Sequence, residues 1–243
     1  MVAFALITLG VLVTKRRRAM PVIHPLVLGQ VARAGLRQLP LVSLLAAALG
    51  FVVIGQTVAL LSRVGAHGYV GAVMVTVVVR ELGPLVTALV VLLRVGTPTV
   101  IELGTARALG EVEALEALGI DPVHYLVVPR VLGMAIALLV LSVYLMLGTL
   151  FSGFLFAFLQ DVPLSPGEYA RQIVLALAWE DFVLVALKAA AFGAIIAVVT
   201  CFHGLARPLQ LSDVSRSTTR ALVASLLACV GLDALFIGVY LLL

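Results

Sequence analysis

Two adjacent opposite charges, Arg80 and Glu81, lie in a segment that is otherwise apolar, VVVRELGPLVTALVVLLRVG at residues 77–96. Gly83 and Pro84 follow directly, and Pro84 clashes with the carbonyl of Arg80, so we expect the helix to kink there. Adjacent helical residues point about 100° apart, so the two charges cannot share one partner. Because ionisable groups inside a membrane are costly, we favour a polar binding spot over charges that merely neutralise each other or a neighbouring helix.

Lys188 and Asp233 are two further charges inside apolar segments. Each lies near the middle of its segment, so the two side chains can meet at a similar depth. Buried charges are tolerated when they are paired. We therefore predict a structural ion pair between the fourth and fifth spans. We expect Trp179, Glu180 and Asp181 nearer the outer end, where tryptophan commonly anchors at the interface.

Motifs for catalysis, nucleotide binding and metal binding are absent from the sequence. Neither lysine, Lys15 or Lys188, belongs to a G-x-x-x-x-G-K-[ST] phosphate loop, so any driving nucleotide binds another subunit. The sequence has no H-E-x-x-H or G-x-S-x-G motif, and Cys201 and Cys229 have no metal-ligand spacing. We predict that this chain is not an enzyme and holds no metal or cofactor.

The composition is that of a membrane protein. Hydrophobic residues make up 63% of the chain and charged residues 12%, and the mean hydropathy is +1.23. Runs of the roughly 20 apolar residues that cross a bilayer recur, and they are continuous, which favours helices over a barrel. The predicted fold is an all-α membrane protein. Residues 1–40 form an N-terminal interfacial, amphipathic segment, with a truncated span as the alternative for its first part. Residues 41–243 form one domain whose five spans cover about 41–63, 72–102, 125–159, 172–200 and 219–242.

The distribution of basic residues predicts the orientation, because cytoplasmic loops carry an excess of lysine and arginine. With a cytoplasmic N-terminus, the outer side holds only Arg63 and Arg171. The inner side then holds Lys15, Arg16, Arg17, Arg18, Arg33, Arg37, Arg107, Arg130, Arg207, Arg216 and Arg220. Five spans place the C-terminus outside.

The segment TARALGEVEALEALGIDP predicts a short amphipathic helix at about residues 105–119, on the cytoplasmic side. Gly119 and the following Asp121-Pro122 provide a C-terminal stop. The helix combines an apolar stripe with three glutamates, and an acidic helix is repelled by the anionic inner leaflet. A protein partner is therefore the preferred interpretation over a helix that rests on the membrane. The stripe consists of Leu109, Val112, Leu115 and Leu118, and the acidic residues are Glu111, Glu113 and Glu116.

The stretch RELGPLVTALVVLLRVGTPTVIELGTARALGEVEALEALGIDPVHYLVVPR resembles MlaE-type (YrbE) permeases, as does VSRSTTRALVASLLACVGLDALF near the C-terminus. These permeases are the membrane subunits of ABC transporters that move phospholipids between bacterial inner and outer membranes. The motifs R-E-L-G-P, E-L-G-T, D-P followed by P-R, and S-R-x-T-T-R occur in the family's order. The resemblance covers about residues 28–240.

The resemblance implies a homodimer in the bacterial inner membrane, with a lipid pocket at the dimer interface that opens to the periplasm. It also implies two cytoplasmic ATPase subunits, which bind ATP and Mg²⁺, and periplasmic MCE-domain proteins. Arg80 and Glu81 match the polar pair of the pocket, which the resemblance implies is lined by the first two spans. Val53, Gln56 and Leu60 fall on one face of the first span, at i, i+3 and i+7, and are candidates to line it. The coupling helix that docks into the ATPase corresponds to the segment that contains Arg107, Glu111, Glu113 and Glu116.

Two positions depart from the family pattern. Gly110 stands where the family usually carries a glutamate early in the coupling helix, which should cost about 1 kcal/mol of helix stability relative to alanine. Pro98 follows LLRVG, where the family carries Ala-Gly-Arg-x-Gly. Both positions bear on ATPase coupling.

These observations predict a permease subunit that moves phospholipids while a partner hydrolyses ATP. Arg80 would offer a bidentate donor to a lipid phosphate, and Glu81 would temper its charge or meet an amine headgroup. The alternative is a non-transporting membrane scaffold that anchors an MCE and ATPase complex, and a weaker one is a secondary transporter. Phospholipid bound to the purified protein distinguishes a transporter from a scaffold.

Overall fold

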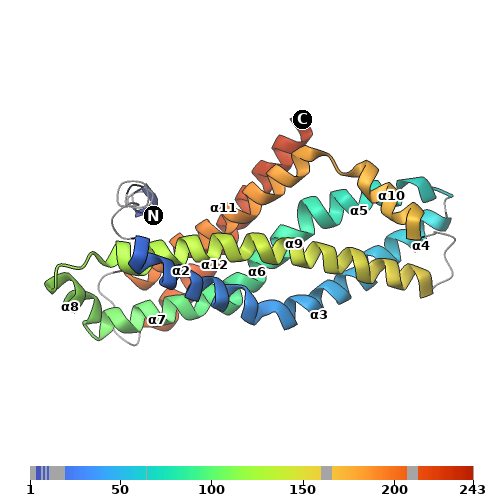
Figure 1. The fold of residues 1–243 in the computed structure, drawn as a ribbon. Helices are drawn as coiled ribbons and strands as arrows, with labels where there is room; N and C mark the ends of the chain where they lie inside the picture. Colours follow the sequence, from blue (N-terminus) through green and yellow to red (C-terminus); the bar gives the residue numbers. More distant parts are fainter. Residues whose placement is uncertain are drawn as a thin grey trace. The chain divides into compact units, whose positions relative to one another are not determined.

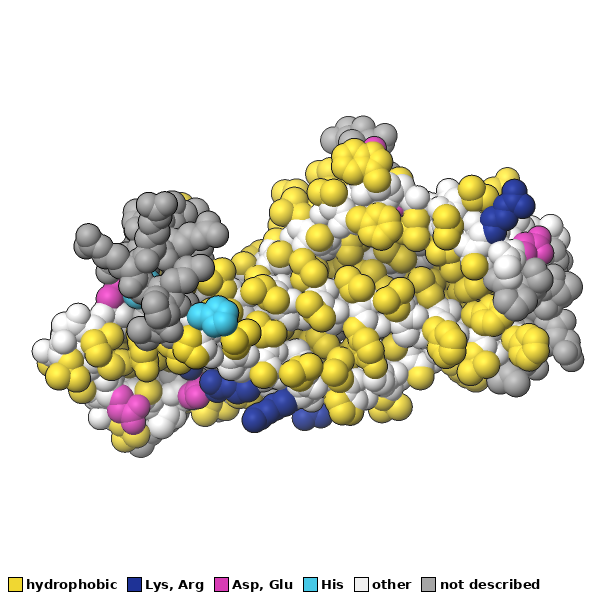
Figure 2. Space-filling model, in the orientation of Figure 1, with side chains coloured by type: hydrophobic (Ala, Val, Ile, Leu, Met, Phe, Trp, Pro, Cys, Tyr) yellow, Lys and Arg dark blue, Asp and Glu magenta, His cyan; other side chains and the backbone are white. Residues whose placement is uncertain are grey.

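The computed structural model describes residues 4–6, 8, 10, 20–63, 65–159, 166–206 and 213–242, and all secondary structure in these ranges is helical (Figure 1). Within these ranges, five helices are long and apolar enough to cross a membrane. They are His24–Val58, Val70–Ala108, Val123–Phe156, Trp179–Gly204 and Val214–Tyr240. The predicted all-α membrane fold with five spans is therefore confirmed. Hydrophobic side chains cover most of the face seen in Figure 2, as expected for helices surrounded by lipid.

The first long helix, His24–Val58, contains a short 3-10 turn after α2. α2 (Met20–Ala34) ends where the Gly35 amide donates to the Val31 carbonyl at 2.7 Å, and the 3-10 turn η1 (Leu36–Gln38) follows. The span then continues as α3 (Leu39–Leu49), the π-helix η2 (Gly50–Ile54) and α4 (Gly55–Arg63). The interfacial placement of residues 1–40 stays a prediction, and Lys15 to Arg18 lie outside the described residues.

The second span is a continuous helix that changes its winding beside the charged pair. It begins with α5 (Val70–Met74), becomes the π-helix η4 (Val75–Leu82), and continues as α6 (Gly83–Val91), the π-helix η5 (Leu92–Gly96) and α7 (Thr97–Ala108). The kink expected at Pro84 stays a prediction, and the structure has the π-helix η4 ending two residues before it. Pro84 has no N–H to donate to the Arg80 carbonyl, so that carbonyl needs another donor.

The predicted cytoplasmic helix at 105–119 is wrong in its extent. α7 ends at Ala108, and the separate helix α8 (Glu111–Ala117) begins after Gly110, whose φ is +78°. Glycine adopts this left-handed conformation without the penalty of a side chain, and it commonly ends a helix. Gly110 is therefore a junction residue, so the helix-interior cost expected from the sequence does not apply.

The remaining helices follow the predicted order with one corrected boundary. The π-helix η6 (Val123–Val127) leads into α9 (Val128–Leu159), and α12 (Val214–Leu242) ends the described chain. The fourth span was predicted from residue 172, but α10 (Pro166–Ala176) ends before α11 (Trp179–Gly204) begins. The Asp181 carboxylate accepts a hydrogen bond from the Ala178 amide at 3.0 Å and so caps the start of α11. The residues before Trp179 are apolar, so hydrophobic periodicity alone does not show that a new helix begins there.

The chain divides by its contacts into two compact units. Unit 1 comprises residues 1–38, 88–138 and 190–243, and unit 2 comprises 39–87 and 139–189. In unit 1, α7 packs on α12. The predicted domain boundary at residue 40 stays a prediction.

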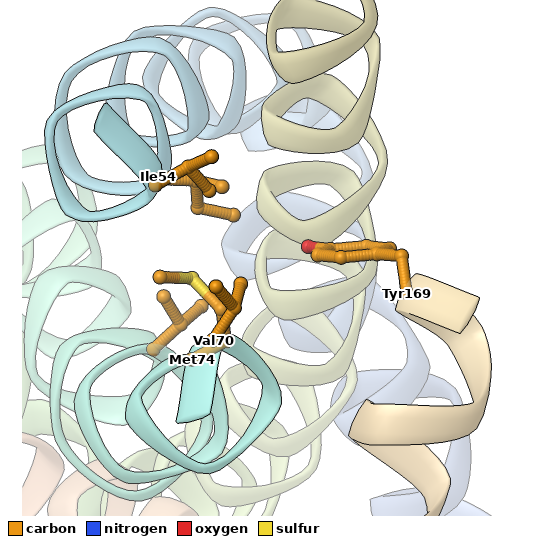
Figure 3. Packing of buried hydrophobic residues seen from close by; sticks show 6 residues of the cluster. Ile54, Val70, Met74 and Tyr169 are labelled. Atoms are coloured by element: carbon orange, nitrogen blue, oxygen red, sulfur yellow. The ribbon is translucent and has the colours of Figure 1, made fainter. Parts of the chain in front are cut away.

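The core of unit 2 gathers residues from η2, α4, α5, η4 and α10 (Figure 3). The fully buried residues there are Ile54, Val58, Val70, Met74 and Val78, and Tyr169 of α10, 6% exposed, packs with them. The Tyr169 hydroxyl donates to the Leu150 carbonyl at 3.3 Å, and burial raises the pKa of this phenol to about 12. α10 is thus anchored by an aromatic side chain whose polar end has a partner.

Candidate functional site

Arg80 is paired with Asp181, a residue of the first turn of α11. The guanidinium Nε lies 2.8 Å from Oδ1 of Asp181, and Nη2 donates to Oδ2 at 3.2 Å. The Asp181 side chain is 2% exposed, whereas that of Arg80 is 29% exposed. Asp181 thus binds both a guanidinium and the Ala178 amide, which supplies the hydrogen bonds that a buried carboxylate requires.

Glu81 is paired with Lys188, which is also on α11. The Lys188 ammonium lies 2.8 Å from a carboxylate oxygen of Glu81 and donates to the Arg80 carbonyl at 3.0 Å. In a regular α-helix the residue at position 84 donates its N–H to this carbonyl, but Pro84 has no N–H. Lys188 is fully buried. One ammonium therefore neutralises a carboxylate and satisfies a backbone acceptor beside the proline.

The spacing on α11 explains how two adjacent charges each obtain a partner. Asp181 and Lys188 are seven residues apart, or about two helical turns, so they lie on the same face of the helix. Arg80 and Glu81 each contact a different residue on that face. Both charges are therefore paired with a neighbouring helix, which was the alternative to a polar binding spot. Their role in substrate binding stays a prediction.

Lys188 forms an ion pair with Glu81, a different residue from the predicted partner Asp233. Its ammonium contacts Glu81 within unit 2. Asp233 belongs to unit 1, so its predicted pair with Lys188 would join the two units, and it stays a prediction.

The three residues predicted along the first span do not share one environment. Gln56 and Leu60 are exposed, and Leu60 exposes 64% of its surface, whereas Val53 is half-buried against the core of unit 2. The described cavity lies elsewhere in unit 2, with walls from α9 and α11, and none of the three residues lines it. The pocket predicted for Val53, Gln56 and Leu60 stays a prediction.

The predicted coupling residues form a charge cluster between α7 and α8 in unit 1. Arg107 lies 3.0 Å from Glu113 through Nε and 3.8 Å from Glu116 through Nη1. The Arg107 side chain is 7% exposed, whereas the two glutamates are about half exposed. Val112 is buried, whereas Leu109 and Leu118, at the ends of the predicted stripe, are exposed. The cluster fixes α8 against the end of α7.

A second cluster in unit 1 centres on Glu102 of α7. One carboxylate oxygen lies 3.6 Å from Arg33 of α2, and the other accepts a hydrogen bond from Arg130 of α9 at 3.2 Å. Arg130 is buried and also donates to the Leu126 carbonyl at 2.7 Å. Glu102 thus connects three helices of unit 1. Among the described residues, no group of three or more His, Cys, Asp or Glu could hold a metal ion.

Comparison with known proteins decides the family. The model of the permease MlaE family matches residues 27–239. The chain belongs to the MlaE permease family. The resemblance drawn from the R-E-L-G-P, E-L-G-T and S-R-x-T-T-R motifs is therefore confirmed.

Curated relatives of this chain include two that are named as probable ABC transporter permeases. A probable ABC transporter permease of Synechocystis is 36% identical over 68% of this chain and 62% of its own length. The chloroplastic protein TRIGALACTOSYLDIACYLGLYCEROL 1 of Arabidopsis thaliana is 32% identical over 82% of this chain and 57% of its length. A probable ABC transporter permease of Rickettsia prowazekii is 30% identical over 84% and 79%. The chain thus spans about six tenths of the first two relatives.

Two residues whose partners the hydrophobic pattern does not indicate are Asp181 and Glu102. The pattern places Asp181 at the interface beside Trp179, and Glu102 occurs within the E-L-G-T motif. The spacing on α11 gives a signal for Asp181. Asp181 and Lys188 are seven residues apart on one face of that helix, and their charges are opposite to those of the adjacent Arg80 and Glu81. Glu102 gave no such signal, since its partners Arg33 and Arg130 are remote in the sequence.

Proposed function

We propose that this MlaE permease is the membrane subunit of an ATP-driven transporter that moves phospholipids between the inner and outer membranes. The single observation that carries the proposal is the family match over residues 27–239. Relatives named as probable ABC transporter permeases support an ATP-driven system. The name of the chloroplast relative refers to a glycerolipid, which supports a lipid as cargo.

Arg80 is our candidate for the headgroup contact. Its side chain stays 29% exposed while it is paired with Asp181, so a ligand can reach part of the guanidinium. A guanidinium presents parallel N–H donors that suit phosphate oxygens. The two pairs contain two cations and two anions, so an arriving phosphate competes with Asp181 for Arg80 instead of meeting an isolated positive charge.

Glu81 takes a different role from the one expected from the sequence. Its carboxylate is held by Lys188 at 2.8 Å, and the same ammonium holds the backbone of Arg80. In our proposal Glu81 and Lys188 therefore position the turn that carries Arg80. An amine headgroup can contact Glu81 only through the 28% of its side chain that stays exposed.

Coupling to ATP hydrolysis is assigned to α8. The partner ATPase binds ATP and Mg²⁺ and docks on α8 and its flanking residues, where Glu111, Leu109 and Leu118 are exposed. Arg107 holds Glu113 and Glu116, so these two glutamates orient α8 instead of meeting the ATPase first. α7 continues without a break into the helix that carries Arg80, which gives a covalent route from α8 to the charged turn.

The wider assembly in this proposal follows the family pattern. The permease is a homodimer in the bacterial inner membrane, with a cytoplasmic N-terminus and a periplasmic C-terminus. A periplasmic MCE-domain protein receives or delivers the lipid. The distribution of lysine and arginine near the span ends supports this orientation.

Transport in reconstituted vesicles tests the proposal. The permease, its ATPase and its MCE partner are reconstituted with a fluorescent phospholipid, and lipid transfer is followed with and without ATP. We expect transfer that requires ATP and stops when the ATPase is inactivated. A complex that assembles and hydrolyses ATP but transfers no lipid would support the membrane scaffold instead.

Two substitutions separate phosphate binding from the ion pair. Arg80→Gln removes both the pair and the headgroup donor, whereas Asp181→Asn removes the pair, keeps an oxygen for the Ala178 amide and leaves Arg80 in place. We expect Arg80→Gln to lower the phospholipid that co-purifies and Asp181→Asn to preserve or raise it. Equal losses in the two variants would show that only the ion pair matters and would remove Arg80 as the headgroup contact.

A further inference from the structure

Unit 2 contains a cavity of about 160 Å³, and neither Arg80 nor Glu81 is among the residues that line it. α9 and α11 form its walls, and Val79 of η4 and Leu177, before α11, complete it. Val53, Gln56 and Leu60 are absent from its lining. The cavity is therefore distinct from the pocket that the sequence predicted along the first span.

We propose that this cavity binds one hydrocarbon chain of a bilayer phospholipid, which enters sideways between α9 and α11. The chemistry of the lining favours this occupant. Asp181 is the one polar residue among the lining residues, and Arg80 and the Ala178 amide already occupy its carboxylate. The cavity thus offers a ligand only apolar surface, so a headgroup or an ion finds no partner there.

The mouth of the cavity faces the medium that contains such chains. Leu147 of α9 and Phe182 of α11 both line the cavity, and they are 64% and 65% exposed. Both residues lie within membrane-spanning helices. Lipid chains are what surrounds such helices in a bilayer, so a chain is the molecule that reaches this opening.

The size of the cavity suits part of a chain. An engineered apolar cavity of roughly 150 Å³ in a soluble protein stays dry and binds benzene, so a hydrocarbon segment is an appropriate guest for a space of this size. Moving a chain from the bilayer into the protein gains no hydrophobic energy, because both environments are apolar. The gain comes from van der Waals contacts that the lining of an empty cavity lacks.

Photolabelling tests the proposal without the ATPase. The full-length permease is placed in nanodiscs that contain a phosphatidylethanolamine with a diazirine on one acyl chain, and labelled peptides are identified by mass spectrometry. We expect labels on the cavity-lining residues of α9 and α11. Ala186→Leu fills the cavity from α11, and labelling there should fall about tenfold, which corresponds to about 1.4 kcal/mol.

Leu187→Phe is the matched control. Leu187 is the next residue on α11, is 57% exposed and does not line the cavity, so added volume there should leave the labelling unchanged. If Ala186→Leu does not fold, Val143→Phe narrows the same cavity from a position on α9 that is 46% exposed and so tolerates a larger side chain.

Thermal unfolding provides a second readout. Added phospholipid should raise the Tm of the wild-type protein in detergent more than the Tm of Ala186→Leu, whose cavity is already filled. Labels that avoid the lining, or that persist equally in Ala186→Leu and Leu187→Phe, would overturn the proposal. Because no ATP is used, loss of ATP-driven transport together with intact labelling would contradict the proposed function and leave the chain site standing.

Discussion

The charge pairs of unit 2 and those of unit 1 differ in what surrounds the exposed partner. In unit 2, the buried members Asp181 and Lys188 face Arg80 and Glu81, whose side chains are 29% and 28% exposed within a membrane-spanning helix. In unit 1, the buried members are Arg107 and Arg130, and their glutamate partners are about half exposed near helix ends.

This difference predicts which substitutions are costly. A charge left alone in unit 2 has mainly hydrocarbon around it, whereas a glutamate left alone at the helix ends of unit 1 has water available. Removing one member of a buried pair strands the other, and the loss depends on the solvation that the stranded group can recover. The location of the remaining charge therefore matters more than the distance within the pair.

The largest effect is expected for Lys188→Met. Methionine has a similar length, but it leaves the Glu81 carboxylate without its ammonium and the Arg80 carbonyl without its donor. We expect the free energy of unfolding in mixed detergent to fall by about 3 kcal/mol. Glu81→Gln together with Lys188→Met should recover part of the loss, and Leu187→Met serves as the control. An unchanged stability of Lys188→Met would contradict the comparison.

A smaller effect is expected for Glu113→Gln combined with Glu116→Gln. The double substitution removes both carboxylates and leaves the Arg107 guanidinium, which is 7% exposed, without an ionic partner among them. We expect a loss of about 2 kcal/mol, the range for hydrogen bonds to charged groups, together with weaker binding of the ATPase. Glu111→Gln, at an exposed position of the same helix, is the control for the lost negative charge. Equal effects on stability in the two variants would show that Arg107 does not anchor α8.

Gly110→Ala tests the junction between these charge-bearing helices. Helix propensity alone predicts that alanine stabilises the segment by about 1 kcal/mol. The φ of +78° predicts the opposite sign, because a side chain in the left-handed region costs about 1 kcal/mol or more. Thermal unfolding of this variant beside Ala114→Gly, within α8, decides between the two. An increase in Tm for Gly110→Ala would place Gly110 inside a continuous helix.

The smallest effect is expected for Glu102→Gln. Arg33 is exposed enough to be hydrated, and Arg130 keeps its hydrogen bond to the Leu126 carbonyl, so neither guanidinium is stranded. We expect a loss below about 1 kcal/mol that shrinks further as salt is added. A loss as large as that of Lys188→Met would mean that solvation of the remaining charges does not set the cost.

The sequence by itself determined the membrane class, five spans, their order and the family. Hydrocarbon forces each crossing segment to be a long apolar helix, and such segments are visible in composition alone. The motifs around Arg80 and Glu102 then identified the MlaE family before any geometry was known.

Only the tertiary structure decided which charge meets which. The alignment of Asp181 and Lys188 with Arg80 and Glu81 depends on how α11 is aligned against η4, and helical periodicity does not encode alignment between helices. The start of α11 depends on a cap made by a side chain, and the role of Gly110 depends on the sign of one dihedral angle. Pairing, capping and handedness are properties of atoms brought together by folding, so a linear pattern of residue types leaves them open.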